Sequence, residues 1–108
     1  MDLTFHRLIP RDLRRALDYY EAEGGLILGD RFFKAAEGCV ERIRERPEAH
    51  HFSDGGYRRA SLETFPYHFL YEIDSLGIWI AVLRHDKRHP SYGLRRQRRG
   101  QQGVDPNA

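Results

Sequence analysis

Residues 65–90, FPYHFLYEIDSLGIWIAVLRHDKRHP, contain two aromatic and β-branched runs on either side of a short turn-forming segment. The runs at 67–73 and 78–83 have the composition of strands, and the four residues 74–77, which end in glycine, are typical of a tight hairpin turn. The second run continues directly into a group of cations and imidazoles at 84–89. This stretch therefore predicts a β-hairpin that holds a basic cluster at its far end, and strands position side chains more firmly than loops do.

The residues before this hairpin have a helical pattern. A short alternating segment at 3–8 predicts a strand, and apolar residues spaced for one helix face follow at 10–23. Gly24 and Gly25 end that helix, and a second helical pattern runs from about residue 26 to residue 46, before a proline. Two helices joined by so short a link must lie antiparallel.

The order of elements predicts the fold class. A loop composition at 47–56 separates the helices from another strand-like run at 57–63. The chain then reads strand, helix, helix and three strands, which predicts an α+β fold with an antiparallel helical hairpin on one face of a small, mainly antiparallel sheet. We expect one domain over residues 1–94 and a basic, disordered tail over residues 95–108, which has few apolar residues.

The register of the hairpin decides which side chains lie on which face. Pairing Ile73 with Ile78 puts His68 opposite Leu83 and diagonal to His85. The apolar face, expected to lie under the helices, then holds Tyr67, Phe69, Tyr71, Ile73, Ile78, Ile80 and Val82. The other face is expected to be open and functional, and it holds His68, Leu70, Glu72, Trp79, Ala81, Leu83 and His85.

Charge is unevenly distributed along the chain. The 108 residues include 18 Lys or Arg and 16 Asp or Glu, but residues 84–99 contain seven cations and only one acid, Asp86. A basic end of this kind favours binding to a polyanion or an acidic partner, and a merely solvated basic tail is the alternative. Sixteen of the cations are arginine, which binds phosphates and carboxylates bidentately.

Several classes of protein are disfavoured by composition. No apolar run approaches the roughly 20 residues of a membrane helix, and the N-terminal apolar stretch is too short for a signal peptide, so we expect a cytoplasmic protein that binds no membrane. The single cysteine, Cys39, lies in a helical apolar pattern and is expected to be a core residue. His85 and His89 alone do not make a zinc site, so we expect no metal and no cofactor.

A pattern that spans residues 3–92 resembles the RelE/ParE superfamily of small toxins from bacterial type II toxin–antitoxin systems. The residues that carry the resemblance are Asp12-Leu13, Tyr19-Tyr20, Arg31-Phe32, Pro47, Arg58-Arg59-Ala60, the run Phe65 to Tyr71, and His85-x-Lys87-Arg88-x-Pro90. The resemblance implies a toxin that blocks growth when its cognate antitoxin is degraded.

The superfamily has two branches with different targets. RelE-like members cleave mRNA on the ribosome without a metal, whereas ParE-like members poison DNA gyrase. The Phe-Pro-Tyr segment at 65–67 and the ending at 85–90 are closer to ParE-like and plasmid-stabilisation proteins. We therefore expect a ParE-like gyrase inhibitor. The alternatives are a ribosome-dependent mRNA endoribonuclease and a nontoxic module that binds nucleic acid or protein.

The resemblance also implies candidate site residues. For a ribonuclease, His68 would be the general base and His85 or His89 the acid, while Arg88 matches a late arginine of the RelE-like pattern and Tyr92 lies near its tyrosine. Histidine suits both proton roles near neutral pH. The residues expected to bind the target or nucleic acid are Arg58, Arg59, Arg84, Lys87, His89 and Trp79.

Overall fold

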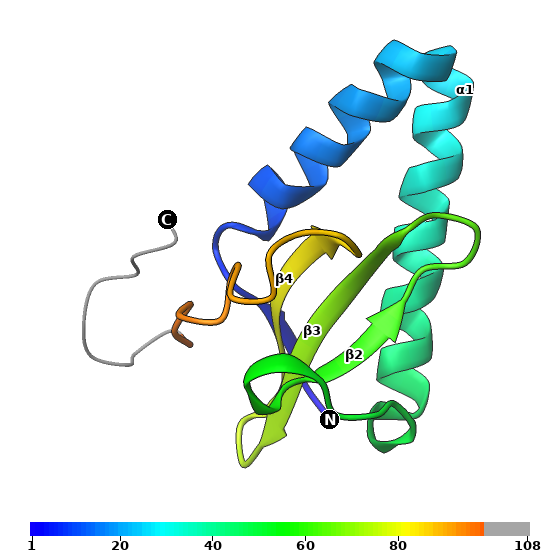
Figure 1. Cartoon of the computed structure of the whole chain (residues 1–108). Coiled ribbons are helices and arrows are strands. Elements are labelled where there is room, and N and C mark those ends of the chain that lie inside the picture. The colour runs from blue at the N-terminus through cyan, green and yellow to red at the C-terminus, as the bar shows by residue number, and fades with distance from the viewer. Residues whose placement is uncertain (99–108) are drawn as a thin grey trace.

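The computed structural model describes residues 1–98 and confirms the α+β class (Figure 1). The four strands form one sheet in the order β1-β4-β3-β2, in which only β1 and β4 are parallel. The elements are β1 (Leu3–Phe5), α1 (Ile9–Glu45), the short 3-10 turns η1 (Pro47–Ala49) and η2 (Asp54–Gly56), β2 (Arg58–Ser61), β3 (Tyr67–Asp74) and β4 (Gly77–His85).

The helical hairpin is confirmed, although the structure gives it as one interrupted helix. Within α1, Gly24 and Gly25 have non-helical backbone angles, and Gly25 has a φ of 75°, which glycine adopts without steric cost. Figure 1 shows the two arms of α1 meeting at this point in a V. Both arms pack on the same side of the sheet, since Ala16 of the first arm and Ile43 of the second belong to one core.

Aromatic packing joins the hairpin to the sheet. The ring of Tyr20 lies 5.0 Å from Phe32 and 4.9 Å from Phe65, and Phe32 lies 5.1 Å from Tyr67. The Phe-Pro-Tyr segment that leads into β3 thus supplies two rings to a cluster that spans both arms of α1. Phe32 is fully buried, and full burial of such a side chain contributes roughly 1.5–3 kcal/mol.

The hairpin register is as predicted near its turn and shifts by one residue beyond it. Ile73 lies opposite Ile78, as expected, but a β-bulge between Leu70 and Tyr71 changes the register of the rest of the pair. Tyr71 pairs with Ile80 and Leu70 pairs with Val82, so β4 contributes one extra residue there. A single inserted residue moves every later side chain to the opposite face.

The predicted faces are therefore wrong for β4 beyond the bulge, whereas Tyr67 and Phe69 of β3 lie in the core as predicted. Leu83 lies in the core under α1, whereas Val82 belongs to a second apolar cluster on the other face. His68 pairs with Arg84 instead of lying opposite Leu83, and His85 pairs with Tyr67.

A buried ion pair lies beside the bulge. The Asp12 carboxylate accepts hydrogen bonds from Nη1 and Nη2 of Arg96 at 2.6 and 2.9 Å, and from the backbone N–H of Leu83 at 3.2 Å. Arg96 also donates to the carbonyl oxygen of Ala81, the extra residue of β4, at 3.0 Å. Both charged side chains are at most 1% exposed. The pair therefore satisfies backbone groups at the bulge and links α1 to the segment after β4.

The outer face of the sheet, predicted to be open, is covered. Trp79 is 3% exposed and packs with Leu70 and Val82 beneath Tyr92 and Leu94. The latter two belong to the segment after β4, which is orange in Figure 1. The prediction was wrong because the apolar residues of that face are buried by the chain's own C-terminal segment.

Part of the predicted tail packs with the domain. Arg96 and Arg98 are 2% and 6% exposed, and Arg98 lies 2.8 Å from the Asp74 carboxylate. Residues 99–108, the rest of the predicted tail, lie outside the described residues, so the end of the domain stays a prediction. Within residues 1–98, no helix is long and apolar enough to cross a membrane.

The Asp12–Arg96 pair gives a prediction about stability. Arg96→Ala is expected to lower the free energy of unfolding by about 3 kcal/mol, because it leaves the Asp12 carboxylate buried without its cation. Arg95→Ala removes the same charge from an exposed neighbour and is expected to change it by less than about 0.5 kcal/mol. Urea unfolding followed by circular dichroism measures both values, and equal stabilities for the two variants would contradict the prediction.

Candidate functional site

The ten candidate residues predicted from the sequence fall into three groups by exposure. Three are buried, namely His68, Trp79 and Arg84. Four are half-buried, namely Arg58, Arg59, His85 and Tyr92, and three are exposed, namely Lys87, Arg88 and His89. Only some of the predicted surface is therefore available to a partner.

His68 is held between two neighbours. Its Nε2 accepts a hydrogen bond from Nε of Arg84 at 2.9 Å, so the ring proton lies on Nδ1, which donates to the Asp86 carboxylate at 2.8 Å. Burial lowers the pKa of His68 below its usual value, while the hydrogen bond to Asp86 acts in the opposite direction. With 1% of the residue exposed and both nitrogens engaged, the geometry gives no support to His68 as a general base. Its catalytic role stays a prediction.

Arg84 uses its whole guanidinium inside the protein. Besides His68, it contacts the Asp54 carboxylate at 2.6 Å and the carbonyl oxygens of Pro90 and Tyr92 at 2.8 and 2.9 Å. These contacts hold η2 and the segment after β4 against the sheet. The geometry therefore makes Arg84 a structural anchor, because each of its three guanidinium nitrogens has a partner inside the protein.

Arg58 and Arg59 also have internal partners. Arg58 donates to the carbonyl oxygens of Glu48 and His50 at 3.2 and 2.9 Å, and Arg59 lies 3.1 Å from the Asp86 carboxylate. Both side chains are partly exposed, but these contacts connect β2 to the preceding loop and to the end of β4. Their predicted role in target binding is not tested by this geometry.

The remaining candidates form one group with exposed and half-buried members, the β4-end cluster, which consists of His85, Lys87, Arg88, His89 and Tyr92. The backbone N–H of Lys87 donates to Nδ1 of His85 at 3.0 Å, so a neutral His85 carries its proton on Nε2. The guanidinium carbon of Arg88 lies 4.0 Å from the centroid of the Tyr92 ring. The structure thus brings together the predicted residues that follow β4.

Sequence reasoning missed one member of this neighbourhood. Arg15, on the first arm of α1, approaches the hydroxyl group of Tyr92 at 3.5 Å. Nothing in the local pattern indicates this contact, because it requires Arg96 to dock the C-terminal segment on Asp12, one helical turn before Arg15.

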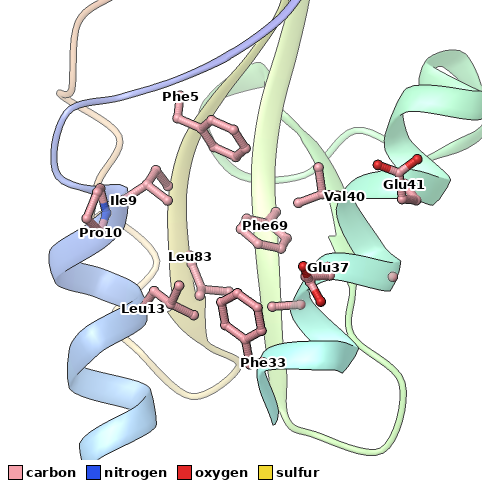
Figure 2. A pocket seen from close by; sticks show the side chains of 12 residues that line it. Phe5, Ile9, Pro10, Leu13, Phe33, Glu37, Val40, Glu41, Phe69 and Leu83 are labelled. Atoms are coloured by element: carbon pink, nitrogen blue, oxygen red, sulfur yellow. The ribbon is translucent and has the colours of Figure 1, made fainter. Parts of the chain in front are cut away.

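A second surface feature is an apolar groove of about 660 Å³ between the two arms of α1 (Figure 2). Phe69 and Leu83 of the sheet form its floor, and Phe33 projects into it from the second arm. Glu37 and Glu41 are its acidic lining residues, and both are exposed. The other apolar side chains labelled in Figure 2 are those of Phe5, Ile9, Pro10, Leu13 and Val40.

The described residues do not form a metal site. Among residues 1–98, no group of three or more His, Cys, Asp or Glu side chains is placed to hold a metal ion. Cys39 is buried, and burial raises the pKa of its thiol to about 11. The thiol donates to the carbonyl oxygen of Ala60 at 3.4 Å, which fits the core role expected for this cysteine.

Comparison with solved structures shows a similarity that covers most of the chain. A solved structure described as the chromosomal ParDE TA system from P. aeruginosa is similar with a TM-score of 0.59 and 21% sequence identity. The match covers 79% of this chain and 95% of the other. At this identity the likeness concerns the fold, and it agrees with the α+β architecture described above. A search of curated proteins found no match.

The family model for the ParE toxin of the type II toxin–antitoxin system parDE matches residues 3–90. The matched region runs from β1 to the β4-end cluster and so includes every strand of the sheet. The chain therefore belongs to the ParE toxin family of type II toxin–antitoxin systems.

Proposed function

We propose that this protein inhibits bacterial growth by acting on DNA gyrase and that a cognate antitoxin neutralises it. The observation that carries the proposal is the match of residues 3–90 to the ParE toxin family. The proposed target places the action of the protein in the cytoplasm. The β4-end cluster, which presents Lys87 and Arg88 to solvent, is the surface proposed to contact the target.

The geometry of His68 favours inhibition by binding over RNA cleavage. General-base catalysis requires a nitrogen within hydrogen-bond reach of the substrate proton. In this protein Arg84 and Asp86 occupy the two nitrogens of His68. A binding surface needs exposed charge and shape but no proton acceptor, and the β4-end cluster meets that requirement.

Ribosome-dependent cleavage of mRNA is the second candidate function. It is favoured by one observation, namely that His85, Arg88 and Tyr92 line a common small cavity together with Arg15. Arginines at such a site can stabilise the charge of a pentavalent phosphate, and histidine can donate a proton. Cleavage of mRNA would need a proton acceptor other than His68, because both ring nitrogens of His68 are engaged.

The apolar groove supports the proposed neutralisation by an antitoxin. A groove lined by side chains such as Phe33 and Leu13 suits the apolar face of an amphipathic segment. Glu37 and Glu41 would favour a segment that also carries basic residues. The groove and the β4-end cluster have no residue in common, so binding at one can be tested without altering the other.

The proposed target surface gives a prediction for gyrase inhibition. The double variant Lys87→Ala/Arg88→Ala is expected to need about 10-fold more protein for half-inhibition of gyrase, because it removes two exposed cations from the contact. The measurement is DNA supercoiling by purified gyrase. The control Arg31→Ala/Lys34→Ala removes two exposed cations from α1 and is expected to inhibit like the original protein.

Two results would contradict this account. Unchanged inhibition by the Lys87→Ala/Arg88→Ala variant would exclude the β4-end cluster as the target surface. Absence of gyrase inhibition by the original protein, together with codon-dependent mRNA cleavage in a reconstituted translation reaction, would favour the ribonuclease instead.

The apolar groove gives a separate prediction. Phe33→Glu is expected to weaken binding of the antitoxin encoded beside the toxin gene by about 30-fold, because it places a charge among apolar groove residues. Gyrase inhibition should be unchanged. Leu26→Glu adds the same charge at another exposed apolar residue, outside the groove, and should bind the antitoxin normally. Calorimetric titration measures both affinities, and equal affinities for the two variants would rule out the groove as the docking site.

A further inference from the structure

A small cavity of about 90 Å³ lies where the first arm of α1 meets the ends of β3 and β4. Its polar lining comes from separate parts of the chain. Arg15 belongs to α1, Tyr67 to β3 and His85 to β4, while Arg88 and Tyr92 follow β4. Three of these residues belong to the β4-end cluster, and Arg15 and Tyr67 complete the cavity.

The charges inside the cavity are not balanced. Among the described residues that line it, Asp12 is the only one with a carboxylate, and both oxygens of Asp12 are bound by Arg96. Arg84 also lines the cavity, but it is paired with Asp54. Within residues 1–98, neither Arg15 nor Arg88 forms an ion pair with a carboxylate. The cavity therefore keeps two uncompensated positive charges.

The arrangement of these cations is constrained by aromatic side chains. The guanidinium of Arg88 lies 4.0 Å from the centroid of the Tyr92 ring, and Nη1 of Arg15 lies 3.5 Å from the Tyr92 hydroxyl oxygen. Tyr67 and His85 are in edge contact with their ring centroids 5.1 Å apart. Guanidinium groups with open donors beside a phenol hydroxyl provide convergent hydrogen bonds for an oxyanion.

The aromatic rings indicate what carries that oxyanion. Tyr67, His85 and Tyr92 are each only half-buried, so part of each ring borders the cavity or the solvent beside it. Proteins that bind single-stranded nucleic acids combine backbone-binding cations with aromatic rings on which bases stack. Since the Arg88 guanidinium lies over the Tyr92 ring, Tyr67 and His85 are the rings left for such contacts. An acidic peptide would use the cations but would gain little from these two rings.

We propose that this cavity binds a phosphodiester group of a single nucleic-acid strand, with Arg15 and Arg88 as its cationic ligands and Tyr92 as a hydroxyl donor. The proposal deepens the proposed function by naming the ligand chemistry at the β4-end cluster. It rests on that function for the role of the binding in the cell, but the binding itself does not require gyrase. Binding can be measured with the purified protein alone, so failure of this proposal and failure of gyrase inhibition are distinguishable.

The test uses fluorescence anisotropy with a labelled, short single-stranded oligodeoxynucleotide. Arg15→Ala is expected to weaken binding by about 10-fold, since it removes charge-assisted hydrogen bonds to phosphate. The matched control is Arg14→Ala, because Arg14 is the adjacent exposed arginine, pairs with Asp18 and does not line the cavity. The control should bind within about 2-fold of the original protein, because surface charges away from the contact add little.

The salt dependence provides a second readout. Affinity for the oligonucleotide should decrease with salt between roughly 50 and 200 mM, and the negative slope of log affinity against log salt should become shallower by about 0.7 for each phosphate contact removed. We expect this change in Arg15→Ala and Arg88→Ala but not in Arg14→Ala. Circular dichroism should show unchanged folding, because all three arginines are exposed.

Three outcomes would overturn the proposal. The first is equal affinity of Arg15→Ala and the original protein. The second is an equal loss in Arg14→Ala, which would mean that the binding is diffuse surface electrostatics. The third is tighter binding of a glutamate-rich peptide than of the oligonucleotide, lost in the same variants, which would assign the cavity to an acidic protein partner.

Discussion

The ion pair between Asp12 and Arg96 determines how the two ends of this domain come together. The residues are 84 positions apart in the chain, and both side chains are almost fully buried. Burial of two charges is tolerated only when their attraction and additional hydrogen bonds compensate for lost hydration. Here the compensation includes backbone groups of β4, because Asp12 accepts from the Leu83 N–H and Arg96 donates to the Ala81 carbonyl. The pair is therefore linked to the bulge as well as to the two segments that carry the charges.

The bulge has consequences for both surfaces of the sheet. It places Leu83 under α1, where it forms the floor of the apolar groove, and it places Arg84 opposite His68. The docked C-terminal segment covers Trp79 and brings Tyr92 within reach of Arg15. One buried contact thus contributes to the groove proposed for the antitoxin and to the cavity proposed for a phosphodiester. The ion pair does not itself touch a partner in the function proposed for this ParE-family chain. It positions the residues that do.

The sequence was sufficient for the architecture because the relevant signals are local. Apolar spacing defined both arms of α1, Gly24 and Gly25 marked the reversal, and the hairpin register was correct at Ile73 and Ile78. The bulge was not predictable, since one extra residue in an apolar run leaves no mark in composition. The pairing of the arginines was not predictable either. The sequence around Arg96 is that of a basic tail, and it does not show whether the side chain is solvated or paired with a distant buried aspartate. For these two reasons the burial of His68, Arg84 and Trp79 was not foreseen, and their functional roles stay predictions.

Trp79 is the single tryptophan, so its fluorescence reports whether residues 95–98 are needed to keep the outer face of the sheet covered. The measurement is tryptophan fluorescence, with acrylamide quenching, of chains ending at residue 94 and at residue 98. The expected result is that the chain ending at 98 behaves like the full chain, whereas the chain ending at 94 shows emission at longer wavelength and stronger quenching. Identical spectra and quenching for the two shortened chains would contradict it, because Trp79 would then remain buried without Arg96.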